Sequence, residues 1–524
     1  MTDHRPHIAI IGAGVGGLAA AMRLSHIGAR VTLFDRHATP GGKMRTVPSV
    51  AGPVDAGPTV LTMKHVFEEL FANTGSPLAN HVTLHREHIL ARHFWPDGTV
   101  FDLTADPQEN MAAVAETFGL TSAQEFQTFT ARAKTLFDAF DLPMMQTVTP
   151  SLLSLTPQVL RNPRLIPQMD SLRTLAQSLD AQFSDPRLAQ LFGRYATYVG
   201  GSPYASPALL SLISHAEARG VWYVEGGMHN LAQAMAQRAA ALGAEIHLGT
   251  HVHSIEMQAG RPTAVATETG RTPIDSVLFN GDPRALSQGL LGDAARKAVA
   301  PKATEPRSLS AYVHSFAAQA SGVDLAGHNV FFCANPRDEF DPIARGEMPA
   351  DATLYICAQD RFGGTQPQGP ERFEIIMNAP PTGDGTPLSE QEHNQCHSAT
   401  LRRLAHFGLH FSPEPPASTL TMPQHFAELF PASTGSLYGR SPHGMMAAFQ
   451  RPTVRSKIPG LYLVGGGVHP GAGIPMATLC ARHAADAIMI DHSLTSRSHR
   501  PGTPGGTSMG SQTAAPGPSP SSPS

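Results

Sequence analysis

Three glycines near the start of the chain have the spacing of a dinucleotide-binding turn. Gly12, Gly14 and Gly17 follow a short apolar run and open an alanine-rich segment with apolar residues at helical spacing. We expect Gly12 to allow a tight turn, Gly14 to let the backbone approach a pyrophosphate, and Gly17 to let helix and strand pack closely. Asp35 ends the next apolar run, where a carboxylate can accept hydrogen bonds from ribose hydroxyls.

The elements that must position these residues follow a strand–helix–strand order. Residues 7–11 are predicted as a buried strand, 18–27 as a helix closed by Gly28, and 29–34 as a second strand. The helix N-terminus, which includes Gly16, would direct free N–H groups and a positive dipole end at phosphates. Glycines in an ordinary loop are the alternative, but the order of strand, turn, helix and acid favours dinucleotide binding.

A second glycine loop follows the second predicted strand directly. Gly41 and Gly42 allow another close approach of the backbone, and Lys43 and Arg45 add positive charge near the predicted phosphates. A further glycine-containing step comes a few residues later, at Gly57, Pro58 and Thr59.

This opening resembles the flavin-containing amine oxidase and phytoene desaturase superfamily, in which a GG-x-x-R segment belongs to the FAD site. The resemblance implies FAD as the cofactor, with NAD as the weaker alternative.

Composition narrows the class of protein. The 524 residues are 41% hydrophobic and 15% charged, which favours a folded chain large enough for two domains. A net charge of −4 without a basic stripe argues against nucleic-acid binding. The four cysteines are far apart, so we expect buried free thiols, a reducing cytosol and no metal site. Without a signal peptide or a long apolar run, any membrane association would be peripheral.

The predicted fold class is α/β, with a Rossmann-type FAD-binding domain and an α+β substrate domain that faces the membrane. We expect residues 251–255 and 262–268 to be strands that extend the Rossmann sheet, residues 91–103 to form a hairpin, and 111–140 to be helical. The predicted division is a discontinuous FAD-binding domain at 1–75, 224–300 and 450–492, a substrate domain at 76–223 and 301–449, and a disordered tail at 493–524, after a helix that ends near 491.

Residues 147–169 leave two interpretations open. The segment is rich in leucine and proline, has Arg161 and Arg164, and contains no acid. It could be an interfacial patch that enters a bilayer beside anionic headgroups. It could equally be an ordinary pair of core helices, because periodicity alone does not separate the two.

A late glycine-rich segment extends the resemblance. Residues 461–475, with their His469-Pro470-Gly471 step, resemble the bacterial phytoene desaturase family of carotenoid enzymes. Residues 51–63, 91–98 and 191–201 are most similar to the 1-hydroxycarotenoid 3,4-desaturases (methoxyneurosporene or hydroxyneurosporene desaturases) of purple photosynthetic bacteria. The resemblance implies further FAD-binding residues at Val252, Gly466, Gly467, Gly473, Ile474, Pro475 and Met476.

The resemblance also implies a reaction. A desaturase of this family removes two hydrogens from a C–C bond flanking a polyene, here the C-3,4 bond of an acyclic 1-hydroxycarotenoid, with oxygen or a quinone as electron acceptor. Glu225 replaces part of the family's proline-containing turn at 224–227 and is a candidate proton acceptor; a surface or capping carboxylate is the favoured alternative. The expected location is the cytoplasmic side of a cytoplasmic or photosynthetic membrane.

Other functions fit the same motifs. Within flavin enzymes the rivals are a phytoene or neurosporene desaturase, a carotenoid isomerase and an amine oxidase. A non-enzyme rival is a lipid-binding chaperone with the fold of guanine-nucleotide dissociation inhibitors, against which the intact glycine turn and Asp35 argue.

Overall fold

A parallel five-stranded sheet forms around the first strand of the chain. In the computed structural model, which describes residues 5–385 and 389–498, β1 (His7–Ile11) pairs in parallel with β2 (Arg30–Phe34) on one side and with β13 (Ser276–Phe279) on the other. The full order is β20 (Leu461–Leu463), β13, β1, β2 and β9 (Glu245–His247). Strands far apart in sequence therefore meet beside the first glycine turn, and the predicted Rossmann-type sheet is confirmed.

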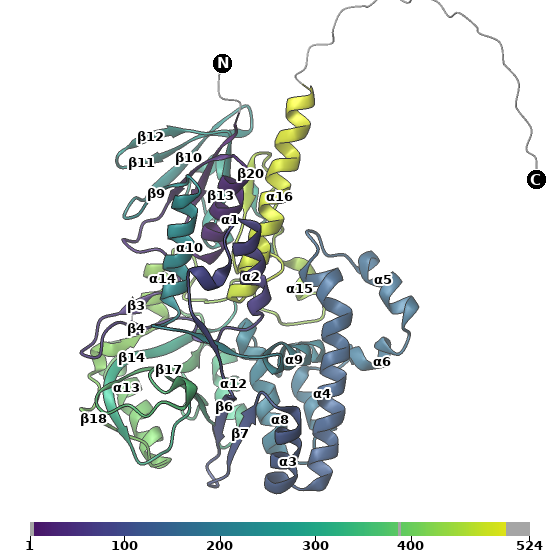
Figure 1. Cartoon of the computed structure of the whole chain (residues 1–524), viewed down its shortest axis with the longest axis vertical. Helices are drawn as coiled ribbons and strands as arrows, with labels where there is room; N and C mark the ends of the chain where they lie inside the picture. Colours follow the sequence, from purple (N-terminus) through teal and green to yellow (C-terminus); the bar gives the residue numbers. More distant parts are fainter. Residues whose placement is uncertain (1–4, 386–388, 499–524) are drawn as a thin grey trace, which may run out of the picture.

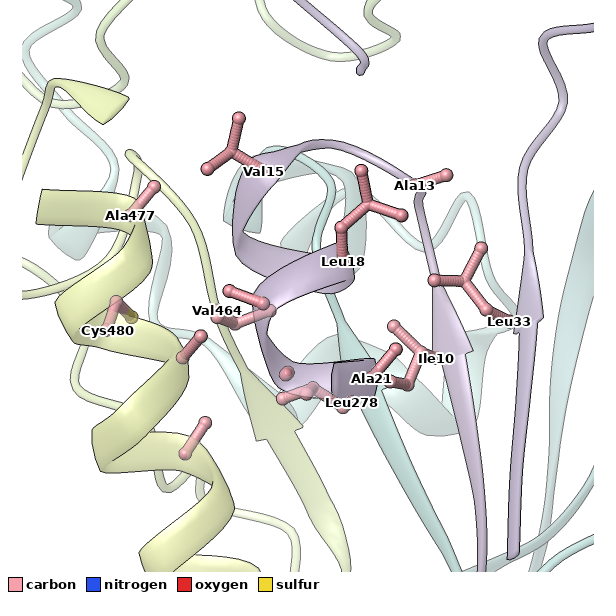
Figure 2. Packing of buried hydrophobic residues seen from close by; sticks show 14 of the residues in the cluster. Ile10, Ala13, Val15, Leu18, Ala21, Leu33, Leu278, Val464, Ala477 and Cys480 are labelled. Carbon is pink, nitrogen blue, oxygen red and sulfur yellow. The ribbon is translucent and has the colours of Figure 1, made fainter. Parts of the chain in front are cut away.

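Helix α1 (Val15–His26) packs on this sheet between two other helices. Its partners are α10 (His229–Ala241) and α16 (Ile474–Ser498), which come from the middle and the end of the described chain (Figure 1). Figure 2 shows Leu18 and Ala21 of α1 among Ile10 and Leu278 of the strands and Val464, which directly follows β20. The alanines of α1 are fully buried, because small side chains let helices approach closely.

Two boundaries near the end of the chain differ from expectation. Helix α16 continues to Ser498, seven residues past the predicted end at 491. The predicted disordered tail therefore overlaps the helix at 493–498, and its remaining part, 499–524, lies outside the described residues.

The predicted extension of the parallel sheet by residues 251–255 and 262–268 is wrong. Strands β10 (Val252–Gln258), β11 (Arg261–Thr267) and β12 (Gly270–Pro273) form a separate antiparallel sheet. Ala259 and Gly260, both at positive φ, turn the chain back at once. A two-residue hairpin can join only antiparallel strands, since parallel pairing needs a long crossover.

A second, larger sheet lies apart from the first. Its eight strands run in the order β18 (His410–Ser412), β14 (Ser310–Ser321), β17 (Glu371–Ala379), β16 (Leu354–Ala358), β15 (His328–Phe331), β6 (Ile89–Phe94) and β7 (Val100–Thr104), with β19 (Leu420–Thr421) also pairing β14. The predicted 91–103 hairpin is confirmed as β6 and β7. Gly98, at positive φ, donates its N–H to the Trp95 carbonyl at 3.0 Å.

A group of helices stands beside the large sheet (Figure 1). The predicted helix at 111–140 is divided into α3 (Pro107–Phe118) and α4 (Leu120–Phe140). Gly119 separates them with φ +93°, a conformation that a helix cannot contain. The same group includes α5 (Leu152–Arg161), α6 (Leu165–Met169), α7 (Leu175–Gln182), α8 (Pro186–Gly193) and α9 (Leu212–Ala218).

The remaining elements connect or cover the two sheets. They are the strands β3 (Thr46–Val47), β4 (Val54–Asp55), β5 (Leu84–Arg86) and β8 (Trp222–Val224), and the helices α2 (Lys64–Asn73), α11 (Pro283–Ser287), α12 (Pro336–Ala344), α13 (Glu390–His406), α14 (Pro423–Leu429) and α15 (Ala447–Gln450). The cysteines Cys333, Cys357, Cys396 and Cys480 are buried and free, as predicted.

Candidate active site

The first glycine turn and Asp35 form one hydrogen-bonded unit. The Gly12 N–H donates to the Phe34 carbonyl at 2.7 Å. The Asp35 carboxylate accepts the Ala13 N–H at 2.6 Å and the His37 N–H at 2.7 Å, one on each oxygen. Each carboxylate oxygen can accept a second hydrogen bond, so Asp35 is held in place and can still bind a ribose hydroxyl.

The late glycine loop lies against the N-terminus of α1, as the sequence predicted. A Cβ added at Gly16 would lie 3.0 Å from the Gly465 Cα and 2.7 Å from the Asn280 Oδ1. Asn280 also donates from Nδ2 to the Gly12 carbonyl at 3.0 Å. Three segments distant in sequence thus meet within van der Waals contact around the turn.

Three buried cations lie in or beside the second and the late glycine loops. Burial lowers the pKa of Lys43 to about 8, and its Nζ donates to the Leu437 carbonyl at 2.5 Å. Burial also lowers the pKa of Arg451 to about 10. The Nε of Arg45 is buried without a hydrogen-bond partner. A buried donor without a partner and cations held below their ordinary pKa fit a bound diphosphate, which would supply the missing negative charge.

A cavity of about 1100 Å³ joins the glycine loops to the large sheet. This volume exceeds the roughly 300–1,000 Å³ of most single-ligand pockets, which leaves room for a dinucleotide and a second molecule. The far wall is mostly apolar, and the sheet residues that form it include Ala311, Val313, Val330, Phe332 and Ile376. Glycine loops at one end and an apolar wall at the other fit a flavin nucleotide and an apolar substrate.

A buried network of hydrogen bonds around Glu217 includes two side chains that line the cavity. Glu217, only 2% exposed, accepts hydrogen bonds from Arg194 at 3.0 Å, Tyr195 at 3.1 Å and Tyr198 at 2.6 Å. Arg194 and Tyr198 also line the cavity. Because every oxygen of Glu217 is paired, the network fixes the position of these two lining side chains.

The structure brings most of the predicted cofactor residues to the cavity surface. The lining residues among them are Gly12, Gly14, Gly16, Asp35, Gly41, Gly42, Lys43, Arg45, Gly57, Pro58, Thr59, Val252, Gly466, Gly467, Gly473, Ile474 and Pro475. Gly17 instead packs helix against turn, since a Cβ there would lie 2.0 Å from the Gly12 carbonyl oxygen.

Two predicted site residues lie elsewhere. Met476 faces away from the cavity and packs in an apolar cluster with Met63 and Leu479, because α16 turns that position outward. The Glu225 side chain is 65% exposed and meets His85 at 2.9 Å on the surface. Glu225 is therefore a surface carboxylate, as in the alternative interpretation, and its prediction as the proton acceptor is wrong.

Several lining residues were missed by the sequence analysis. Asn280 had a usable signal, because it follows a predicted strand in an Asn-Gly-Asp-Pro run. Tyr355, Glu374 and Tyr438 had none, since each becomes part of the cavity only when the large sheet assembles. Tyr355 reaches the cofactor loop directly, with its hydroxyl 2.8 Å from the Thr59 Oγ1.

Comparisons with known proteins agree with this geometry. A family model described as flavin containing amine oxidoreductase matches residues 15–489. A hydroxyneurosporene desaturase of Cereibacter sphaeroides is 53% identical over 494 residues, covering 94% of this chain and 99% of the relative. A protein of the same name from Rhodobacter capsulatus is 48% identical over 485 residues, covering 92% and 98%.

A solved structure of similar fold is a putrescine oxidase bound to putrescine. It has a TM-score of 0.59 at 14% identity and covers 93% of this chain and 99% of its own. At this identity the likeness concerns the fold alone.

Proposed function

The chain belongs to the flavin containing amine oxidoreductase family, and from this we propose that it is an FAD-dependent desaturase of the C-3,4 bond of an acyclic 1-hydroxycarotenoid such as 1-hydroxyneurosporene. The observation that carries the proposal is the continuous cavity from the glycine loops to the apolar sheet wall. A polyene must lie along apolar surface and reach the flavin at one point. The substrate class comes from the relatives named hydroxyneurosporene desaturase.

The chain's own residues bind, orient and exclude water. When bound, the flavin would supply the oxidising chemistry by accepting a hydride from a C–H bond next to the polyene, while the neighbouring carbon loses a proton, so that two hydrogens leave and one C=C bond forms. The glycine loops and Lys43 would hold the diphosphate, and Asp35 would hold a ribose. Val313, Ile376 and Phe332 present an apolar surface that keeps the polyene extended and dry. Alignment of the reacting bond is thus the main contribution of the protein.

FAD is proposed in preference to FMN. Asp35 and Val252 both line the part of the cavity beside the first sheet, where a ribose and an adenine would be bound. FMN would leave this part empty. Denaturing the purified protein and identifying the released flavin by mass tests the assignment. Release of FMN alone would contradict it.

We propose that the enzyme binds the membrane surface through the segment from Leu142 to Arg173. Leu160, Ile166 and Leu172 are 74%, 59% and 99% exposed, and Arg161 and Arg164 are exposed beside them. Apolar side chains flanked by arginines suit an interface with anionic headgroups. Within the described residues, no helix is long and apolar enough to cross a bilayer.

Vesicle flotation tests this membrane surface. Ile166→Glu combined with Leu172→Glu is expected to abolish co-flotation with vesicles that contain phosphatidylglycerol. Leu120→Glu is the control, because Leu120 is an exposed leucine at the start of α4, outside this segment, and its exposure (75%) lies between those of Ile166 and Leu172. Equal flotation of the double variant and the control would reject this surface.

The division into two discontinuous domains stays a proposal with the boundaries given above. It is supported by the strand order of the parallel sheet, which draws on residues before 35, from 245 to 279, and from 461 to 463. The electron acceptor is likewise proposed as oxygen or a quinone.

The function is tested with FAD-loaded protein and 1-hydroxyneurosporene in liposomes, with oxygen or a quinone as acceptor. We expect polyene absorption to move to longer wavelength and the product to lose two hydrogens by mass. A shifted spectrum at unchanged mass would indicate an isomerase. An unchanged spectrum with both acceptors would reject the proposed function.

A further inference from the structure

Glu374 is a buried carboxylate in the cavity that lacks a hydrogen-bond partner for Oε2. Its side chain is 1% exposed, and it lines the cavity from the middle of strand β17. A buried acceptor without a partner costs free energy unless a ligand satisfies it. Because the same wall is otherwise mostly apolar, this carboxylate is a polar group on a surface that would otherwise contact only hydrocarbon.

The position of Glu374 is at the cofactor end of the wall. Glu374 is paired across the sheet with Cys357, and Tyr355 lies two residues from Cys357 on the same face of β16. Tyr355 in turn meets Thr59 of the predicted cofactor loop. Asp55, just before that loop, is close enough for its charge to affect Glu374.

Burial and the nearby charge of Asp55 favour the neutral form of the Glu374 carboxyl group. Burial raises the pKa of Glu374 well above its ordinary value, and the negative charge of Asp55 adds to the rise, while Arg45 opposes it. Arg45 donates instead to the Thr421 Oγ1 at 3.2 Å. A protonated carboxyl can both donate and accept a hydrogen bond, and so can an alcohol.

The chemistry of the proposed substrate places its hydroxyl close to the reacting bond. Three single bonds of about 1.5 Å each join the C-1 hydroxyl oxygen to C-3. Any residue that binds this hydroxyl must therefore lie near the cofactor. Among the described residues, Glu339 and Asp35 are the other buried carboxylates that line the cavity, and both have partners. Glu339 accepts hydrogen bonds from Asn378 at 2.7 Å and from the Thr353 N–H at 3.1 Å, and Asp35 accepts those of Ala13 and His37.

We propose that Glu374 hydrogen-bonds the C-1 hydroxyl of the substrate and thereby selects 1-hydroxylated carotenoids, an inference that rests on the function proposed above. A substrate with hydrogen in place of the hydroxyl would leave the buried carboxyl unpaired. Sites built to bind a hydroxyl reject analogues that lack it far more strongly than apolar pockets reject a missing methylene.

The test compares 1-hydroxyneurosporene with 1,2-dihydroneurosporene, which is the same chain without the hydroxyl. We expect wild-type holoenzyme to prefer the hydroxylated substrate by about 100-fold or more in kcat/KM. Glu374→Met should reduce this preference to within about tenfold, by slowing the first substrate and accelerating the second. Glu374→Gln, which keeps hydrogen-bonding capacity, should retain most of the preference. Ile375→Val, on the same strand but on the opposite face, which packs in the apolar core away from the cavity, should leave it unchanged.

An equilibrium measurement accompanies the kinetics. Trp95 lines the cavity, so bound carotenoid should quench its fluorescence, and wild type should bind the hydroxylated chain at least about tenfold more tightly. If Glu374→Met does not fold, or if the wild type turns over neither carotenoid and the proposed function fails, binding of the two carotenoids to wild type and to Glu374→Gln still tests the inference. Equal binding of the two carotenoids, or equal loss of both activities in Glu374→Met, would overturn the inference.

Discussion

Replacing Gly17 by alanine tests the contact between α1 and the turn after β1. The added Cβ would lie 2.0 Å from the Gly12 carbonyl oxygen, whereas real Cβ contacts essentially never fall below 3.0 Å. The carbonyl must therefore retreat by about 1 Å, and Gly12 belongs to the turn that we propose approaches the diphosphate of FAD. Overpacking of this kind costs about 1–3 kcal/mol, against which the higher helix propensity of alanine returns about 1 kcal/mol.

We expect Gly17→Ala to lower the free energy of unfolding by up to about 2 kcal/mol and to leave most of the protein without flavin. Urea unfolding of the flavin-free protein measures the first effect, and the flavin-to-protein absorbance ratio measures the second. Gly193→Ala is the control, because its Cβ would meet Pro203 at an ordinary 3.7 Å. A Gly17→Ala protein with wild-type stability and one flavin per chain would refute the reasoning.

Two further predictions concern buried charge. Glu217→Leu should cost about 3–5 kcal/mol, because it leaves Arg194 buried without its carboxylate partner. Glu217→Gln also removes the charge but can still accept the hydrogen bond of Tyr198, so it should cost less. Urea unfolding of both variants decides, and equal costs would contradict a contribution of the hydrogen bonds beyond that of the charge. In flavin-free protein the pKa of Lys43 is about 8, against 10.5 in the unfolded chain. Between these two pH values the unfolded state binds more protons than the folded state, so the free energy of unfolding should rise with pH across that window. Lys43→Met should remove up to about 3 kcal/mol of this rise; the same pH dependence in the variant would show that another group is responsible.

Local patterns in the sequence were enough for the elements that carry the cofactor loops. The strand at 7–11 matches β1 residue for residue, and the turn at Gly98 forms the predicted hairpin. In both cases the information lies in neighbouring residues: an apolar run before glycine, or a proline–glycine turn. The same logic failed at Gly119, where one glycine inside a helical pattern ended a helix instead of being tolerated.

Contacts between residues that are distant in sequence could not be predicted from such local patterns. Glu374 belongs to a strand whose alternation says which residues share a face, but burial of that face depends on the loop at Thr59 and on the neighbouring strand β16. Glu225 was chosen because it stands next to a strand that returns to the cofactor domain, yet its own side chain points to solvent. Proximity in sequence therefore selected loop residues that do line one cavity, but a proton-acceptor candidate that lies on the surface.

The contact between Gly16 and Gly465 has a consequence for biogenesis. A ribosome that has released only the first 460 residues has delivered β1, β2 and β13, but not the edge strand β20 or the loop that closes over the N-terminus of α1. Cofactor capture must then wait until the last part of synthesis. Stalled nascent chains should bind no flavin until the segment beyond residue 475 has left the exit tunnel, and in a cell short of flavin the complete polypeptide would accumulate with the cavity between its glycine loops and the large sheet open to proteases.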